Sequence, residues 1–126
     1  MEGLHILAEF HACACGAEAM RDPAAVRRLC LAACETAGLT VVGQVFHGFG
    51  TPAAPAGATG AVVLAESHLA VHTWPELDAV TLDIYVCNYS QDNRAAAEAT
   101  YAALCAAFLP REAVRRDVIR GEISGT

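Results

Sequence analysis

Apolar and polar positions alternate in two segments of the chain, and this period of two is typical of strands with one buried face. The first segment covers residues 4–10 and the second covers residues 79–87. Their apolar faces carry Leu4, Ile6, Ala8, Phe10, Val80, Leu82, Ile84 and Val86. The second pattern leaves Cys87 at a strand end, on the polar face. Other short apolar segments predict strands over 39–47, 61–65, 69–73 and 113–120.

Helical spacing appears between Asp22 and Gly38, where apolar residues recur every three or four positions. These residues are Val26, Leu29, Cys30, Ala33, Cys34 and Ala37. Asp22 followed by Pro23 suits a helix start, and Gly38 suits a helix end. We therefore predict one amphipathic helix here, with its apolar side against a sheet.

A second helix is predicted from a cap at Ser90 or Asp92 to about Phe108, and Pro110 then ends it. The segment 48–60, with sequence GFGTPAAPAGATG, is rich in Gly and Pro and predicts a loop over a site. Residues 13–21 are expected to be a break between a strand and a helix.

The predicted order of elements favours one α+β domain, residues 1–126. In it, two helices pack on one face of a mostly antiparallel sheet, which gives an α/β sandwich. The second face of such a sheet still needs a cover. A homodimer is the economical way to supply it.

Composition limits the partners that this chain can bind. Eight basic and 14 acidic residues give a net charge of −6, which argues against nucleic acid and favours a small-molecule substrate. No apolar segment approaches the roughly 20 residues of a membrane-spanning helix, so no membrane is expected. Because the sequence starts without a secretory signal, a cytoplasmic protein with reduced cysteines is predicted.

Glu66, Ser67, His68 and His72 fall within seven residues and interrupt an otherwise apolar stretch. A serine becomes a nucleophile only when a base or a strained backbone activates it, and this cluster holds imidazoles and a carboxylate close to the serine hydroxyl. Taken singly, Ser67 could be a turn residue and His72 a hydrogen-bonded core histidine. Their combination with Cys87 favours a reactive site.

The stretch GATGAVVLAESHLAVHTWPE, residues 57–76, with Cys87 twenty positions after Ser67, resembles the core of the bacterial and archaeal S-adenosylmethionine decarboxylase proenzymes. Its signature, ESHL-x-x-HTWPE, combines several functional residue types at fixed spacings. Weaker similarity includes Ala8-Glu9-Phe10 and Phe46-His47-x-Phe49.

The resemblance implies that the chain cuts itself between Glu66 and Ser67. In that family the serine hydroxyl attacks the preceding carbonyl in an N→O acyl shift, and elimination and hydrolysis leave a pyruvoyl group. The products would be a β chain of residues 1–66 and an α chain of residues 67–126. Thr59 matches a serine that assists this processing, and His72 matches the histidine that removes the α-proton.

The resemblance also implies the mature reaction. The pyruvoyl group made from Ser67 would form a Schiff base with the substrate amine and would serve in place of pyridoxal phosphate; no metal is expected. Cys87 matches the proton donor, since a thiol can act as an acid. Phe49 and Trp74 are candidates to stack on adenine and face the sulfonium, and Glu76 is a candidate to hold polar parts of the substrate.

Leu77-Asp78-Ala79 departs from the family pattern, which continues after WPE with two aromatic residues around a glycine. Asp78 could bind a distal cationic group, which would favour L-arginine or L-ornithine as substrate, or it could simply make a turn. A third possibility is a non-catalytic homologue that binds ligand or activates a partner. Separately, His11, Cys13 and Cys15 could form part of a metal site or a redox-sensitive thiol pair.

Overall fold

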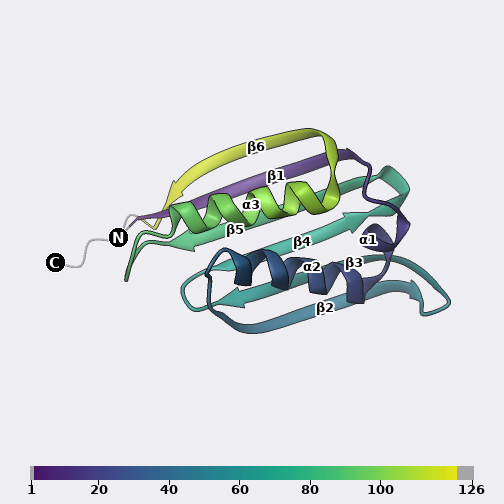
Figure 1. Cartoon of the computed structure of the whole chain (residues 1–126), viewed down its shortest axis with the longest axis horizontal. Helices are drawn as coiled ribbons and strands as arrows, with labels where there is room; N and C mark the ends of the chain where they lie inside the picture. The colour runs from purple at the N-terminus through teal and green to yellow at the C-terminus, as the bar shows by residue number, and fades with distance from the viewer. Residues whose placement is uncertain (1, 122–126) are drawn as a thin grey trace.

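The computed structural model describes residues 2–121, and these form a six-stranded sheet with two main helices on one face (Figure 1). Every strand pair is antiparallel, in the order β2-β3-β4-β5-β1-β6. This confirms the predicted α+β sandwich. The elements are β1 (Gly3–Cys13), α1 (Ala17–Arg21), α2 (Pro23–Thr36), β2 (Val41–Thr51), β3 (Ala54–Leu64), β4 (His68–Trp74), the 3₁₀ turn η1 (Pro75–Leu77), β5 (Ala79–Cys87), α3 (Arg94–Phe108) and β6 (Pro110–Arg120).

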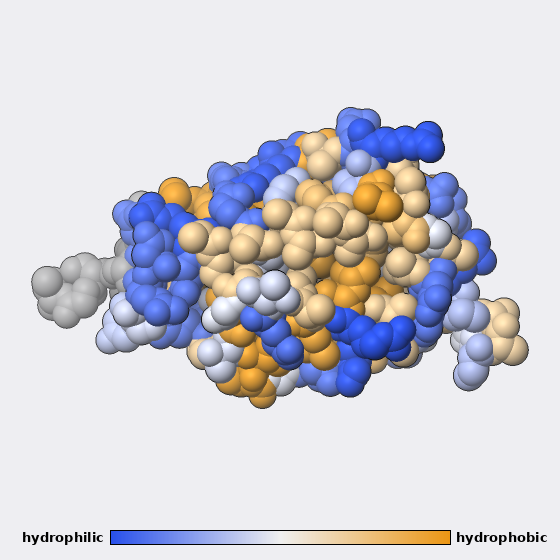
Figure 2. Space-filling model, in the orientation of Figure 1, coloured by the Kyte–Doolittle hydropathy of each residue, from blue (hydrophilic) through white to orange (hydrophobic). Residues whose placement is uncertain are grey.

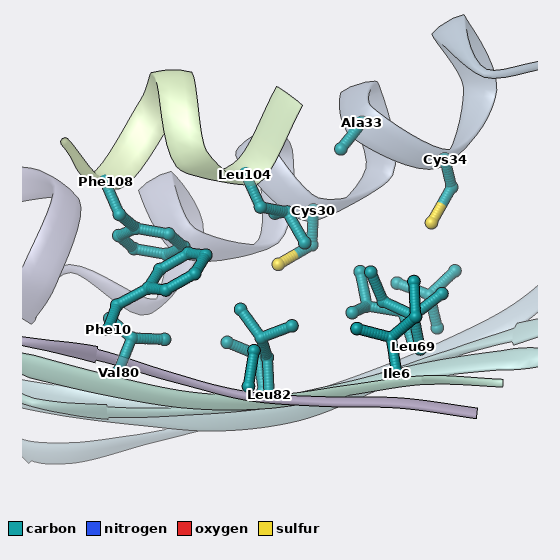
Figure 3. Packing of buried hydrophobic residues seen from close by; sticks show 14 of the residues in the cluster. Ile6, Phe10, Cys30, Ala33, Cys34, Leu69, Val80, Leu82, Leu104 and Phe108 are labelled. Carbon is teal, nitrogen blue, oxygen red and sulfur yellow. The ribbon is translucent and has the colours of Figure 1, made fainter. Parts of the chain in front are cut away.

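The core lies between the sheet and the two long helices (Figure 3). Alternate residues of β1 and β5 point into it, as their period of two predicts. The rings of Phe10 and Phe108 meet there with centroids 6.3 Å apart. Cys30 and Cys34 of α2 are buried on the helix side of the same core, so both act as small apolar residues.

Local signals fixed the start of α2 as predicted. The Asp22 side chain accepts a hydrogen bond from the amide of Ala24 at 3.0 Å, and Pro23 occupies the first turn. The helix ends before Gly38. The short helix α1, in the segment expected to be a break, buries Met20 against the core.

The predicted loop over 48–60 is wrong, because β2 and β3 form a long hairpin that turns at Pro52 and Ala53. Pairing with a neighbouring strand satisfies the backbone of this Gly-rich and Pro-rich segment, which outweighs its weak strand propensity. Gly60 lies directly opposite Phe46, and a Cβ at Gly60 would collide with the Phe46 ring. The glycine therefore makes room for an aromatic side chain rather than for a loop.

Helix α3 starts at Arg94, later than predicted, and β6 starts at Pro110, earlier than predicted. The solvent face of α3 carries Ala95, Ala99, Ala102 and Ala106. The helix layer accordingly has a pale, weakly hydrophobic surface in Figure 2. Alanine suits such positions because it has the highest helix propensity. Within residues 2–121, no helix is both long and apolar enough to cross a membrane.

The opposite face of the sheet has no helix over it among the described residues. Small side chains occupy its middle, where Ala61 of β3 lies directly opposite Ala70 of β4. Large apolar residues are exposed around them and include Val45, Val63, Trp74 and Val118. The sheet thus presents an open face of mixed character, which carries most of the candidate functional residues.

Candidate active site

Glu66 and Ser67 lie where the chain reverses between β3 and β4. The amide of Leu64 donates to the carbonyl of Ser67 at 2.9 Å, and the amide of Ser67 donates back to the carbonyl of Leu64 at 3.4 Å. Only Ala65 and Glu66 lie between this bonded pair, so the Glu66–Ser67 bond belongs to a tight hairpin turn. A small cleft of ≈ 200 Å³ adjoins the turn and is lined by residues that include Thr40, Glu66, Ser67 and Asn93.

Cys87 lies next to this turn although it is twenty residues further along the chain. The amide of Cys87 donates a hydrogen bond to Oγ of Ser67 at 3.4 Å. The Cys87 side chain is buried, with 6% of its surface exposed. The sequence placed this thiol on the polar face of a strand end, and the fold adds that it is shielded from water.

Asn93 fixes the chain immediately after Cys87, and sequence reasoning missed it. Its side-chain amide donates to the carbonyl of Cys87 at 2.9 Å, and its backbone amide donates to Oδ1 of Asn88 at 2.8 Å. Asn93 is buried. Asn88 and Asn93 therefore have a structural role, since the two asparagines hold the loop between β5 and α3.

Thr59 and His72 form a second group on the open face. They are directly opposed in the β3–β4 hairpin, and Oγ1 of Thr59 lies 2.5 Å from Nδ1 of His72. His72 is exposed, and Thr59 is half-buried. A hydroxyl held on an imidazole in this way can exchange a proton with it.

Strand register separates the two groups within one chain. His72 follows Ser67 by five residues along an extended strand, and at about 3.3 Å per residue this is roughly 16 Å between their Cα atoms. The side chains of Ser67 and His72 cannot span that distance. The structure thus brings Ser67 to Cys87 and Thr59 to His72, but it does not bring the two pairs together.

A cleft of ≈ 250 Å³ joins the Thr59–His72 pair to three of the predicted substrate-binding residues, Phe49, Trp74 and Glu76. Trp74 has 44% of its surface exposed, and its indole N–H donates to Oγ1 of Thr81 at 3.3 Å. Phe49 lies beside His47 with ring centroids 5.0 Å apart. This cleft offers two aromatic faces and one carboxylate to a ligand.

Asp78 does not line that cleft. Its backbone is left-handed, with φ of 49°, and its amide donates to the carbonyl of Pro75 at 3.2 Å. Its carbonyl accepts from the amide of Cys13 at 2.9 Å. This geometry fits the interpretation of Asp78 as a turn residue, since Asp tolerates the left-handed conformation better than most residues.

His5 and His68 lie near the first group and belong to a cluster that sequence reasoning did not assign. Arg120 donates from a guanidinium nitrogen to Nδ1 of His5 at 3.4 Å, which leaves Nε2 of His5 facing Asp83 at 3.6 Å. Burial, followed by the charges of His5 and Arg120, lowers the pKa of His68. The period of two in β1 already placed His5 on this face, but only the fold placed it beside His68.

His11, Cys13 and Cys15 do not assemble a metal site in the part of the chain that the structure describes. Cys13 and Cys15 carry free thiols. Burial, followed by the charges of Cys15 and Asp78, raises the pKa of Cys13 to about 11, which keeps this thiol protonated at neutral pH.

The chain is similar to known proteins in sequence. Residues 4–121 match the family model described as S-adenosylmethionine decarboxylase. The chain is 41% identical over 85 residues to an S-adenosylmethionine decarboxylase proenzyme of Pelotomaculum thermopropionicum, a match that covers 68% of this chain and 63% of that relative. It is 36% identical over 121 residues to the proenzyme of the same name from Thermoplasma acidophilum, covering 96% of this chain and 85% of the relative.

The fold is similar to a solved structure as well. The crystal structure of the adenosylmethionine decarboxylase from Aquifex aeolicus superposes with a TM-score of 0.84 at 29% sequence identity, covering 98% of this chain and 94% of that one. The match to the first of the two curated relatives spans less than two thirds of that relative's own length.

Proposed function

Since the chain belongs to the S-adenosylmethionine decarboxylase family, we propose that it releases carbon dioxide from S-adenosylmethionine after cutting itself between Glu66 and Ser67. The product, decarboxylated S-adenosylmethionine, would donate the aminopropyl group in spermidine synthesis. The placement of Ser67 in the β3–β4 turn beside Cys87 supports this proposal.

Self-cleavage uses the chain's own atoms. Oγ of Ser67 attacks the carbonyl carbon of Glu66, the peptide nitrogen takes a proton, and an ester replaces the amide. Removal of the Ser67 α-proton then expels the Glu66 carboxylate and leaves dehydroalanine, whose hydrolysis releases ammonia. A tight turn suits the first step because it holds a hydroxyl close to the preceding carbonyl.

The residues around Ser67 fit the pyruvoyl group that results. Ser67 lies next to a cleft, and its Oγ accepts a hydrogen bond from the backbone amide of Cys87. The thiol of Cys87 is buried. A pyruvoyl group supplies an electron-withdrawing carbonyl that accepts the electrons left by carbon dioxide. Cys87 is positioned to return a proton to the substrate carbon.

A second copy of the chain completes the site in this proposal. Ser67 and His72 of one chain are roughly 16 Å apart along β4, so the proton acceptor for processing must come from elsewhere. A two-fold axis near Ala61 and Ala70 would pack two open faces together and place the Ser67 end of one β4 opposite the His72 end of the other. Small residues at that point let the two sheets approach to about 10 Å, as in face-to-face packing.

The Phe49–Trp74–Glu76 cleft is the proposed binding site for the adenosyl part of the substrate. Two aromatic faces suit a purine ring and a sulfonium cation, whose attraction to an aromatic face is about 0.5–2 kcal/mol. The cleft also contains Thr59 and His72. In the dimer it would therefore face the Ser67 end of the partner subunit.

Decarboxylation of L-arginine or L-ornithine is a weaker alternative. It depends on Asp78 as a ligand for a cationic group, but this residue lies outside the aromatic cleft and makes backbone contacts typical of a turn. A non-catalytic homologue is weaker still, because Ser67 and Cys87 are both present and adjacent.

Intact-mass measurement tests the first step. The 13.2 kDa chain should be replaced by two chains, residues 1–66 and 67–126, while Ser67→Ala should remain whole. Parallel assays of carbon dioxide release from S-adenosylmethionine, arginine and ornithine then test the substrate. An uncut wild-type chain, or release from arginine or ornithine alone, would contradict the proposal.

A further inference from the structure

Tyr85 lies on the open sheet face two residues before Cys87, and side chains from three strands enclose its ring. The His68 ring centroid lies 5.6 Å from the Tyr85 centroid, and the His5 centroid lies 6.1 Å from it. The Arg120 guanidinium carbon lies 4.6 Å from the ring centroid, over its face. These contacts from β4, β1 and β6 restrict the direction of the phenol ring.

The missing side chain of Gly3 leaves room for the Tyr85 ring and its hydroxyl. A Cβ at Gly3 would lie 2.9 Å from Cε1 of Tyr85 and 3.1 Å from its hydroxyl oxygen. The ring therefore lies across the backbone of Gly3, which is the residue directly opposite Cys87 in the β1–β5 pair. At this position the hydroxyl forms a hydrogen bond with the Cys87 side chain.

Building on the proposed function, we infer that Tyr85 is a positioning residue whose hydroxyl orients the Cys87 thiol for proton transfer to the substrate. In that step the S–H bond of Cys87 breaks, the proton moves to the substrate α-carbon, and the electron pair remains on sulfur. Tyr85 keeps its own proton throughout and donates a hydrogen bond to the thiolate. Hydrogen bonds to a charged acceptor are stronger than neutral ones, so this contact favours proton release.

The titration of Tyr85 agrees with a donor role. Burial raises the pKa of Tyr85 most, and the charge of Cys87 and the hydrogen bond with it raise the pKa further, while Arg120 opposes them. The phenol therefore remains protonated at neutral pH. A hydrogen bond that favours the neutral phenol is one in which the phenol O–H donates.

Tyr85→Phe tests this role because it keeps the ring and its contacts with Arg120, His5 and His68. Self-cleavage should proceed as in the wild type. Removal of one hydrogen bond to a charged acceptor should lower kcat for carbon dioxide release by about tenfold, while KM changes less than about twofold. The infrared S–H band of Cys87, isolated by subtracting the spectrum of the matching Cys87→Ala chain, should shift.

Tyr101→Phe is the matched control. Tyr101 also lies under an arginine, with the Arg115 guanidinium carbon 4.6 Å from its ring centroid, and its hydroxyl also bonds a cysteine, Cys105. It belongs to α3, on the other side of the sheet. This variant should leave kcat and the Cys87 band unchanged.

Three results would overturn the inference. An unchanged kcat in Tyr85→Phe with an active wild type would reject the role of Tyr85 and leave the proposed function intact, as would an unmoved Cys87 band. A wild-type chain that cuts itself but decarboxylates no substrate would reject the proposed function together with this role. The two failures are therefore distinguishable.

Discussion

Thr59 and His72 face each other across the β3–β4 hairpin, with Oγ1 of Thr59 2.5 Å from Nδ1 of His72. This pair lies near one end of β4, whereas Ser67 precedes the other end. The proposed processing chemistry needs both, so the distance along a single strand bears directly on how the chain matures.

Complementation between two inactive chains tests this separation. Co-expression of Ser67→Ala with His72→Ala should yield a heterodimer in which the His72→Ala chain is cleaved, because its Ser67 meets His72 of the partner subunit. Each variant alone should stay uncut. Tags of different mass identify the cleaved chain, and co-purification establishes that the heterodimer forms. Copurified but uncut chains would show that His72 acts only on Ser67 of its own chain.

The hydroxyl of Thr59 should matter more than its methyl group. Thr59→Val keeps the shape of the side chain and removes the bond to His72, so cleavage should slow by about 10²-fold, the lower end of what a positioned acid or base contributes. Thr59→Ser keeps the hydroxyl and should cleave within a few-fold of the wild type. The time course of the uncut chain in gels measures both. Equal cleavage rates for Thr59→Val and Thr59→Ser would show that the Thr59 hydroxyl has no role in processing.

Asp78→Asn separates a turn residue from a substrate ligand. Asparagine also tolerates the left-handed backbone, so stability should change by less than about 0.5 kcal/mol. KM for S-adenosylmethionine should not change, because Asp78 lies outside the Phe49–Trp74–Glu76 cleft. Glu76→Gln is the matched comparison within that cleft and should raise KM. A loss of arginine decarboxylation in Asp78→Asn would instead support the alternative substrate.

His68 should make the fold less stable in acid. Burial and the charges of His5 and Arg120 lower its pKa, so the unfolded chain binds this proton more readily than the folded chain. Stability is then lost as the pH falls through about 6.5, the ordinary histidine value, toward the lower folded value. In the uncut Ser67→Ala background, His68→Gln should reduce the drop in urea midpoint between about pH 7.5 and pH 5.5. The same substitution at His11, an exposed residue of the same sheet face, serves as the control.

Gly3→Ala should crowd the Tyr85 ring without affecting self-cleavage. The added methyl group would lie 2.5 Å from the Val86 carbonyl oxygen and 2.9 Å from Cε1 of Tyr85. Overpacking of this kind costs about 1–3 kcal/mol. Gly43→Ala is the matched control, because its Cβ would meet only Val63, at 4.0 Å. Urea unfolding of both variants in the Ser67→Ala background measures the difference, and equal midpoints would contradict the close approach of Tyr85 to Gly3.

Local sequence patterns were enough to predict most of the strands and helices. The period of two placed β1 and β5, and Asp22-Pro23 placed the start of α2, because these signals depend on neighbours in the sequence. The β2–β3 hairpin escaped prediction for the same reason. Its Gly and Pro residues argue against a strand locally, and only pairing with a neighbouring strand offsets that preference.

The sequence by itself determined the candidate reactive residues, since the spacing of Glu66, Ser67, His72 and Cys87 is a linear signature. Only the tertiary structure decided which of them meet. Antiparallel pairing of β4 with β5 puts Cys87 beside Ser67, although the two are twenty residues apart in the sequence. The fixed rise per residue along β4 keeps His72 away from Ser67. The bond from Tyr85 to Cys87 likewise depends on Gly3, a residue more than eighty positions away that reaches them through the sheet.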